Sequence, residues 1–265
     1  MTKIKDNISI YLSMLVCSIK SMMEYRVDFI VGIISQLLTQ IVELIFIWIV
    51  FQNTESLAGW TFDKLLLLYG ITMLTIAIVD FLFDSIYDIG PKYIKDGDFD
   101  KLLLRPIHPL ISVMGDTKTF TAFGYMAISL VLIISMLIKM QINITFMLIA
   151  KIIIFAFSGA LIIGAIMIAF SVTSFYTYKS NEIIWSVFRI YTFAQYPVEI
   201  YNKFIRILIT FIFPFVFATY YPTLNYLGME NGWLMYLSPI VAIIFLIIAV
   251  KVWNWGLNRY RSTGN

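Results

Sequence analysis

The stretch IKDGDFDKLLLRPIHP, from Ile94 to Pro109, is the part of this chain around which the rest is organised. It carries six charged side chains and the chain's only histidine, and strongly apolar sequences lie on both sides of it. Charged side chains are costly to place in lipid, so this stretch must contact water or protein. It therefore predicts a region outside the membrane that separates two groups of membrane-spanning helices.

The residue order within this stretch predicts a turn followed by a short amphipathic helix. Asp96-Gly97 is a turn signal, Asp98 can cap a helix that begins at Phe99, and Pro106 and Pro109 end it after Arg105. Such a helix could fill a groove on another protein, or it could be an ordinary loop that caps the chain's own helices. Its predicted apolar side is Phe99, Leu102 and Leu103, and its solvated side is Asp100, Lys101 and Arg105.

Composition places the whole chain in a membrane. Hydrophobic residues make up 60% of its 265 residues and charged residues only 13%, far from the usage of soluble proteins. The single cysteine, Cys17, excludes a disulfide within the chain and a cysteine-rich metal site. A net charge of +3 is small, so the distribution of lysine and arginine matters more than the total.

On the N-terminal side of the organising stretch, a predicted span runs from Leu65 to Ile89. It ends in Asp80, Asp84 and Asp88, which recur every four residues and so fall on one side of a helix. Three carboxylates in this arrangement could bind a metal ion, but a solvated helix end near the mouth of a cavity is the simpler interpretation. On the other side, the uncharged residues from Thr119 to Ile138 predict the third span.

The first span is predicted from Asp28 to Phe51, preceded by a helix over residues 1–26 that lies on the cytoplasmic surface of the membrane. The run Ile8 to Ile19 is too short to cross, and the residues after it lack the small side chains of a signal-peptide cleavage site. Polar side chains fall on one face of the first span, which must therefore contact protein or water. They are Gly32, Gln36, Thr39, Gln40 and Glu43.

The C-terminal half contains two clear spans and one ambiguous region. The fourth span is predicted from Ile152 to Tyr176, where Ala156, Ala160 and Gly164 would allow close packing within the subunit. The last is predicted from Trp233 to Val250. Between them, hydropathy alone selects a fifth crossing at Ile207 to Tyr221, whereas the prolines fit equally a short crossing followed by a broken, re-entrant helical pair.

Six crossings place both termini on the same side of the membrane. That side carries 16 of the 19 lysine and arginine residues if the fifth crossing is the one selected by hydropathy, and 14 if the region is a short crossing followed by a re-entrant pair. Because positive charge marks the cytoplasmic side, both termini are predicted to be cytoplasmic in either version.

Motifs of common catalytic sites are absent. The sequence has no G-x-x-x-x-G-K-[ST] nucleotide loop, no H-E-x-x-H and no G-x-S-x-G. The lone His108 lies between two prolines and is interpreted as a turn residue. We therefore expect no enzymatic site, no bound cofactor or metal, and no nucleic-acid partner in this chain.

At this point the chain resembles bacterial ABC transporter permeases of the type-two exporter class, in their six-span subgroup. The run Gly97-Asp98-Phe99-Asp100 with Leu102-Leu103-Leu104-Arg105-Pro106 is the most specific part of the resemblance. The other matching pieces extend in order over most of the chain: Gly59-Trp60, Tyr196-Pro197, Pro214, Tyr221-Pro222, and the tail from Gly256 to Gly264.

The resemblance implies an all-α polytopic membrane protein that forms one permease domain over residues 1–265. In this family, a coupling helix in the loop over residues 91–118 contacts a separate ATPase, which binds ATP and Mg²⁺. The residues from 1 to 26 would be a surface helix, residues 181–196 the fifth crossing and residues 197–222 the re-entrant segment. The ATPase-contact residues would be Phe99, Asp100, Lys101, Leu102, Leu103, Leu104 and Arg105.

Two permeases, identical or related, and two ATPases would form the working unit in the bacterial plasma membrane. The transport pathway would lie at the interface between the permeases. Candidate pathway residues are Gln36, Gln40, Glu43, Asp80 and Asp84. Spans rich in Phe, Met and Ile suit an amphipathic or hydrophobic cargo such as a peptide, a drug or a lipid-linked molecule.

Two other functions remain as alternatives. An ion-coupled secondary transporter could use Glu43 with Asp80 and Asp84 as titrating groups, although the two halves show no clear inverted repeat of broken spans. An intramembrane enzyme would need a convergent set of catalytic side chains, which the spans lack.

Overall fold

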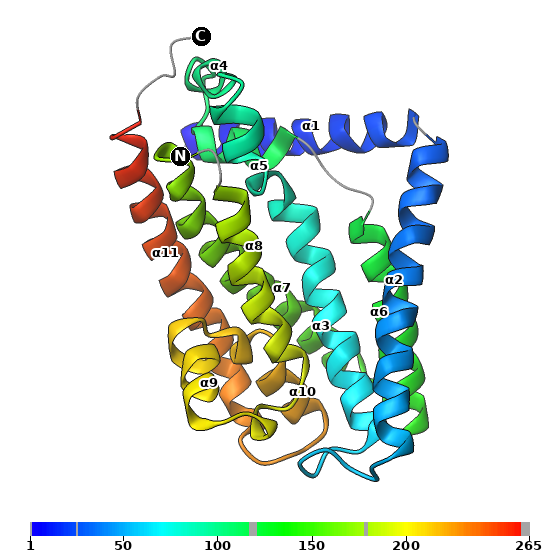
Figure 1. Ribbon diagram of the computed structural model, residues 1–265. Coiled ribbons are helices and arrows are strands. Elements are labelled where there is room, and N and C mark those ends of the chain that lie inside the picture. The colour runs from blue at the N-terminus through cyan, green and yellow to red at the C-terminus, as the bar shows by residue number, and fades with distance from the viewer. Residues whose placement is uncertain (1, 25, 117–120, 178–179, 261–265) are drawn as a thin grey trace.

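The computed structural model describes residues 2–24, 26–116, 121–177 and 180–260, and within these residues it contains helices and no strands (Figure 1). Five helical segments are long and apolar enough to cross a membrane, and a sixth candidate is a bent helical pair. The chain is therefore an all-helical polytopic membrane protein, as predicted. The predicted start of the third span at Thr119 and the tail beyond Tyr260 lie outside the described residues.

The long helices, except α1, form a bundle, and the short ones, except α8, lie at its two ends. Figure 1 shows α4 at one end of the bundle and α9 and α10 at the other. The long helices are α1 (Thr2–Glu24), α2 (Arg26–Gln52), α3 (Phe62–Phe83), α6 (Thr121–Lys139), α7 (Phe146–Ser171) and α11 (Ser238–Leu257). The short helices are α4 (Phe99–Leu103), α5 (Pro109–Asp116), α8 (Ser180–Tyr191), α9 (Lys203–Ile207) and α10 (Tyr220–Tyr226).

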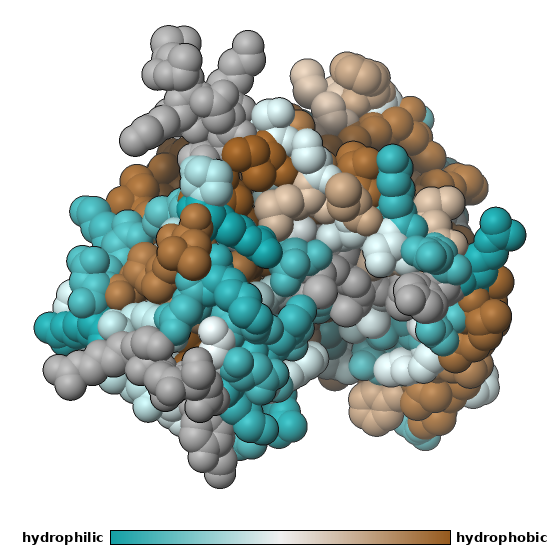
Figure 2. Space-filling view, turned by 90° about the horizontal axis from the view of Figure 1, so that it is seen from above, coloured by the Kyte–Doolittle hydropathy of each residue, from teal (hydrophilic) through white to brown (hydrophobic). Residues whose placement is uncertain are grey.

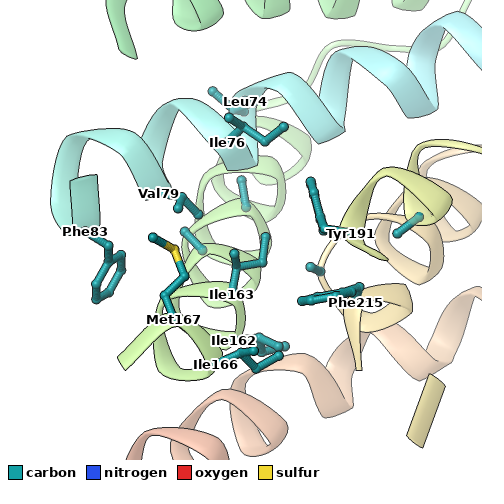
Figure 3. Close-up of a cluster of buried hydrophobic side chains, with 14 of the residues drawn as sticks. Leu74, Ile76, Val79, Phe83, Ile162, Ile163, Ile166, Met167, Tyr191 and Phe215 are labelled. Atoms are coloured by element: carbon teal, nitrogen blue, oxygen red, sulfur yellow. The ribbon is translucent and has the colours of Figure 1, made fainter. Parts of the chain in front are cut away.

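The core lies between α3 and α7, whose apolar side chains interdigitate in Figure 3. Phe83 at the end of α3 packs directly against Gly164 of α7, where an added Cβ would lie 2.4 Å from the ring. Likewise, a Cβ on Gly159 would lie 2.6 Å from the carbonyl oxygen of Ala218. The small residues of α7 therefore serve packing within the subunit, as the sequence predicted.

Helix α1 lies across the end of the bundle, whereas α2 runs along the other spans (Figure 1). The Ser18 hydroxyl donates a hydrogen bond to the carbonyl oxygen of Asp116, 2.6 Å away, and Met14 packs against Gly115. These contacts attach the predicted surface helix to α5, which follows the organising segment.

The fourth span begins earlier than the sequence predicted, at Phe146 rather than Ile152. The Thr145 side chain caps the helix by accepting a hydrogen bond of 3.2 Å from the Leu148 amide. Lys151 lies within this helix, and its Nζ lies over the ring of Tyr236, 5.8 Å from the ring centre.

A proline, rather than hydropathy, determines the structure of the ambiguous region between the fourth and last spans. A single straight crossing from Ile207 to Tyr221 is wrong, because the helical pair Lys203–Ile212 and Phe215–Tyr226 is bent by 71° at Pro214. The pair packs on the end of α8: the Thr219 hydroxyl donates to the carbonyl oxygen of Ala194 at 3.1 Å. Both arms of the pair lie at the end of the bundle opposite α4 (Figure 1).

Candidate functional site

The organising segment, Ile94 to Pro109, projects from the end of the bundle with α4 at its tip (Figure 1). The turn before α4 uses Gly97, whose φ of 75° favours glycine. Asp98 makes no side-chain cap, contrary to the sequence prediction. Instead, Lys101 donates a hydrogen bond of 2.5 Å to its carboxylate, and this bond and the lysine charge lower the pKa of Asp98.

A cluster of aromatic rings anchors α4 to the rest of the protein. Phe99 is fully buried, with its ring centre 4.9 Å from that of Tyr260, 5.3 Å from that of Phe175 and 6.4 Å from that of Trp253. Phe175 lies just beyond α7, Trp253 lies in α11 and Tyr260 follows α11. We call these four residues the aromatic anchor. They bring together the ends of two spans and the organising segment.

A hydrogen bond supplements the aromatic anchor. The Tyr260 hydroxyl donates to the Asp100 carboxylate at 3.1 Å. Partial burial, together with this bond, raises the pKa of Tyr260 to about 12. Asp100 is thus engaged within the chain, although it was predicted to be simply solvated.

The apolar side of α4 divides into buried and exposed residues. Phe99 and Leu102 are buried in the chain's own core, so their prediction as part of a face toward another protein is wrong. Leu103 and Leu104 are exposed, and Leu104 retains 87% of its accessible surface. The exposed tip consists of Lys101, Leu103, Leu104, Arg105 and Pro106.

The residues after α4 attach the tip to α5 and α11. Arg105 donates a hydrogen bond of 2.8 Å to the Ser112 hydroxyl. The His108 Nδ1 accepts a hydrogen bond from the Leu110 amide at 3.3 Å, and its Nε2 lies 3.1 Å from the side-chain oxygen of Asn254. The neutral tautomer that carries its proton on Nε2 satisfies both contacts. His108 is therefore a structural turn residue, as predicted.

Viewed from the α4 end, hydrophilic residues gather over this end of the molecule, with apolar patches among them and at the rim (Figure 2). In the exposed tip, Leu103 and Leu104 form a small apolar knob, and Lys101 and Arg105 give it a basic edge. Such a knob fits an apolar groove with an acidic rim on a partner protein.

The second group of candidate residues lies within the spans. The Tyr69 hydroxyl of α3 lies 2.5 Å from the Gln40 side-chain oxygen and 2.6 Å from the Glu43 carboxylate, both on α2. A phenol has one hydrogen, so it can donate to only one of these two acceptors at a time. Tyr125 of α6 and Tyr196 also lie near Glu43, and Gln36 lies beside Tyr125.

The aspartates of the second span do not form the predicted ladder. The α-helix ends at Phe83, Asp84 begins a 3₁₀ turn, and the chain then forms a π turn from Ile89 to Ile94. Asp80 is buried rather than solvated and accepts a hydrogen bond of 2.9 Å from the Thr121 hydroxyl. Among the described residues, no group of three His, Cys, Asp or Glu side chains could hold a metal ion.

The exposed surface of α2 has a polar flank and an apolar flank. Ser35, Thr39 and Glu43 are exposed at four-residue spacing and form the polar flank. Ile34, Leu38 and Ile45 are exposed on the other flank, which suits lipid. Helix α8 likewise presents polar side chains opposite its buried face, including Arg189. In lipid such a charge would cost about 2.5–3.5 kcal/mol.

Sequence reasoning missed the tyrosines and the aromatic anchor. Tyr69 and Tyr125 connect the predicted pathway residues, yet a tyrosine in an apolar run gives no sign of its polar partner. Trp253 is fully buried beside Phe99 and Phe175. The crowding of aromatic residues after the last span was the only signal that could have indicated this role.

Comparison with family models gives a match over residues 37–264, to the family described as ABC-2 family transporter protein. Comparison with curated proteins and with solved structures gives no significant match. The matched range begins within α2 and includes the organising segment, the bent pair and α11. With its membrane-spanning helical bundle and this match over most of its length, the chain belongs to the ABC-2 family of transporter proteins.

Proposed function

We propose that this chain is the membrane-spanning permease subunit of an ATP-driven exporter, and that the exposed tip of α4 seats in a separate ABC ATPase. The observation that carries this proposal is the contrast within one short helix. Phe99 and Leu102 hold the helix in the core, while Leu103 and Leu104 remain exposed at its tip. An exposed apolar knob on a rigid base is suited to transmit a displacement from a partner into the bundle.

The partner supplies the nucleotide chemistry. The chain contains no phosphate-binding loop, so ATP and Mg²⁺ bind to the ATPase subunit. Two ATPases and two permeases, identical or related, form the working unit in the bacterial plasma membrane, with the termini of this chain in the cytoplasm. The basic edge of the tip, Lys101 and Arg105, supports a contact with an acidic rim on the ATPase.

The pathway lies along the polar flank of α2. Glu43 and Thr39 are exposed on this flank, and a second permease or a water-filled path would remove the cost of exposing them to lipid. The cargo is amphipathic or hydrophobic, such as a peptide, a drug or a lipid-linked molecule. An ion-coupled carrier is a weaker proposal, because Glu43 and Asp80 already bond to Tyr69 and Thr121.

The test is the double substitution Leu103→Asp with Leu104→Asp. If each leucine is buried in the complex, it contributes about 1.5–3 kcal/mol to the contact. Loss of both weakens capture of the ATPase by about two orders of magnitude or more. Because neither side chain contributes to the core, membrane insertion and thermal stability should match those of the wild type.

The matched control is Lys95→Asp, which changes an exposed residue of the same segment before the Gly97 turn. It should retain most of the ATPase binding. If the double variant captured the ATPase with wild-type affinity, the tip would be only a loop that caps its own helices, and the proposal would fail.

A further inference from the structure

A groove of about 550 Å³ lies in the angle between α1 and α2, closed on one side by α6. Its lining combines apolar side chains with one cation. Phe29 and Phe123 meet edge to face inside it, with their ring centres 5.7 Å apart. The lining residues are Ile19, Met22, Met23, Arg26, Phe29, Ile30 and Phe123.

The exposure pattern of α1 shows what surrounds the groove. Leu12, Val16 and Met23 are exposed at helical spacing and form one apolar stripe, with exposed fractions of 54%, 50% and 63%. Ser13 and Lys20 are exposed on a separate side, and Leu15 and Met22 are buried against the protein. A helix with a protein side, an apolar side and a polar side is suited to the boundary between headgroups and acyl chains.

The groove opens where the apolar stripe of α1 meets the apolar flank of α2. Met23 ends the stripe, Ile30 begins the flank, and both line the groove. The occupant that reaches this site in the membrane is therefore a molecule of the bilayer itself, with its hydrocarbon toward these side chains.

Arg26 supplies the polar end of the site. Its side chain lines the groove and is exposed, and it makes no hydrogen bond or ion pair with the side chains that the structure describes. A guanidinium presents a planar fork of donors that matches the oxygens of a phosphate group. Because it lies at the end of an apolar groove, beside a helix whose exposed sides suit the boundary between headgroups and acyl chains, it matches a lipid phosphate.

We propose that this groove binds one phospholipid, with an acyl chain along Met23, Ile30 and Phe123 and its phosphate on Arg26. The lipid fills the angle between the surface helix and the first span. It thereby completes the packing at a junction that the side chains of the described residues leave open.

The experiment uses the full chain, reconstituted in phosphatidylcholine vesicles that contain a limiting amount of phosphatidylglycerol with a photoactivatable acyl chain. After irradiation and digestion, mass spectrometry locates the label. We expect it to concentrate on the peptides that contain residues 19–30 and Phe123. Arg26→Gln should reduce this labelling about tenfold, because it removes a charge-assisted pair with the phosphate.

Two further variants make the result specific. Lys20→Gln removes the same charge from the water-facing side of α1 and should leave the labelling within about twofold of the wild type. Met23→Trp fills the groove from an exposed position and should reduce the labelling while Arg26 remains. An excess of glycerol 3-phosphate should not compete, because it lacks the acyl chain.

Three outcomes would overturn the proposal. Equal losses with Arg26→Gln and Lys20→Gln would show only general attraction to the membrane surface. Equal labelling of the lipid-facing side of α11, at Ile243 and Ile247, would show no selective site. Cross-linking through Met23, substituted with a photoreactive residue, to a second copy of the chain would show that protein occupies the groove.

Discussion

Phe99→Ala tests whether the aromatic anchor holds α4. Phe99 is fully buried, and three rings surround it at centre distances of 4.9–6.4 Å. Truncation of a buried phenylalanine costs about 3–5 kcal/mol from lost burial and the cavity that remains. This range includes the energy of the lost contacts with the neighbouring rings. For a chain of this size we expect a fall in Tm of roughly 6 °C or more.

The assay is thermal unfolding of the detergent-solubilised chain, combined with hydrogen exchange of residues 95–105. We expect faster exchange of this segment in Phe99→Ala as well as the lower Tm, because α4 loses its attachment. Leu104→Ala is the matched control. Because Leu104 is 87% exposed, the Tm and the hydrogen exchange of this variant should equal those of the wild type. If Phe99→Ala unfolded and exchanged like the wild type, the reasoning that anchors α4 to α7 and α11 would be refuted.

Two further predictions concern the spans. Gly164→Ala should destabilise the chain by about 1–3 kcal/mol, because the Cβ of the alanine would lie 2.4 Å from the Phe83 ring. Adding Phe83→Leu should restore the melting temperature. If it did not, the packing of α3 against α7 would be contradicted. Glu43→Gln should leave membrane insertion intact and change transport only modestly, since the amide can still form a hydrogen bond with the Tyr69 hydroxyl. Loss of folded protein from the membrane would instead show that the Glu43 carboxylate is needed for the structure.

The small residues of α7 illustrate a feature that sequence predicted well. Ala156, Ala160 and Gly164 recur at four-residue spacing, which lies on one side of any helix. Close packing on that side follows from geometry alone. The structure adds only the identity of the neighbour, Phe83, which the spacing could not supply.

The candidate site was predicted less completely. The sequence located the organising segment and its amphipathic helix, and it identified Gln40 and Glu43 as polar residues that must avoid lipid. It did not find their partner Tyr69, because a phenol within an apolar span is equally compatible with a lipid interface, a core position or a polar contact. Only the packing of α2 against α3 determines which of these holds.

By itself, the sequence determined that the chain spans a membrane, where its long apolar helices lie and which segment lies outside lipid. These properties follow from local composition and from the cost of burying charge in hydrocarbon. Tertiary structure alone decided which leucines of α4 are exposed. Periodicity defines an apolar face but not what covers it, and the residues that cover Phe99, among them Trp253 and Tyr260, come from distant parts of the chain.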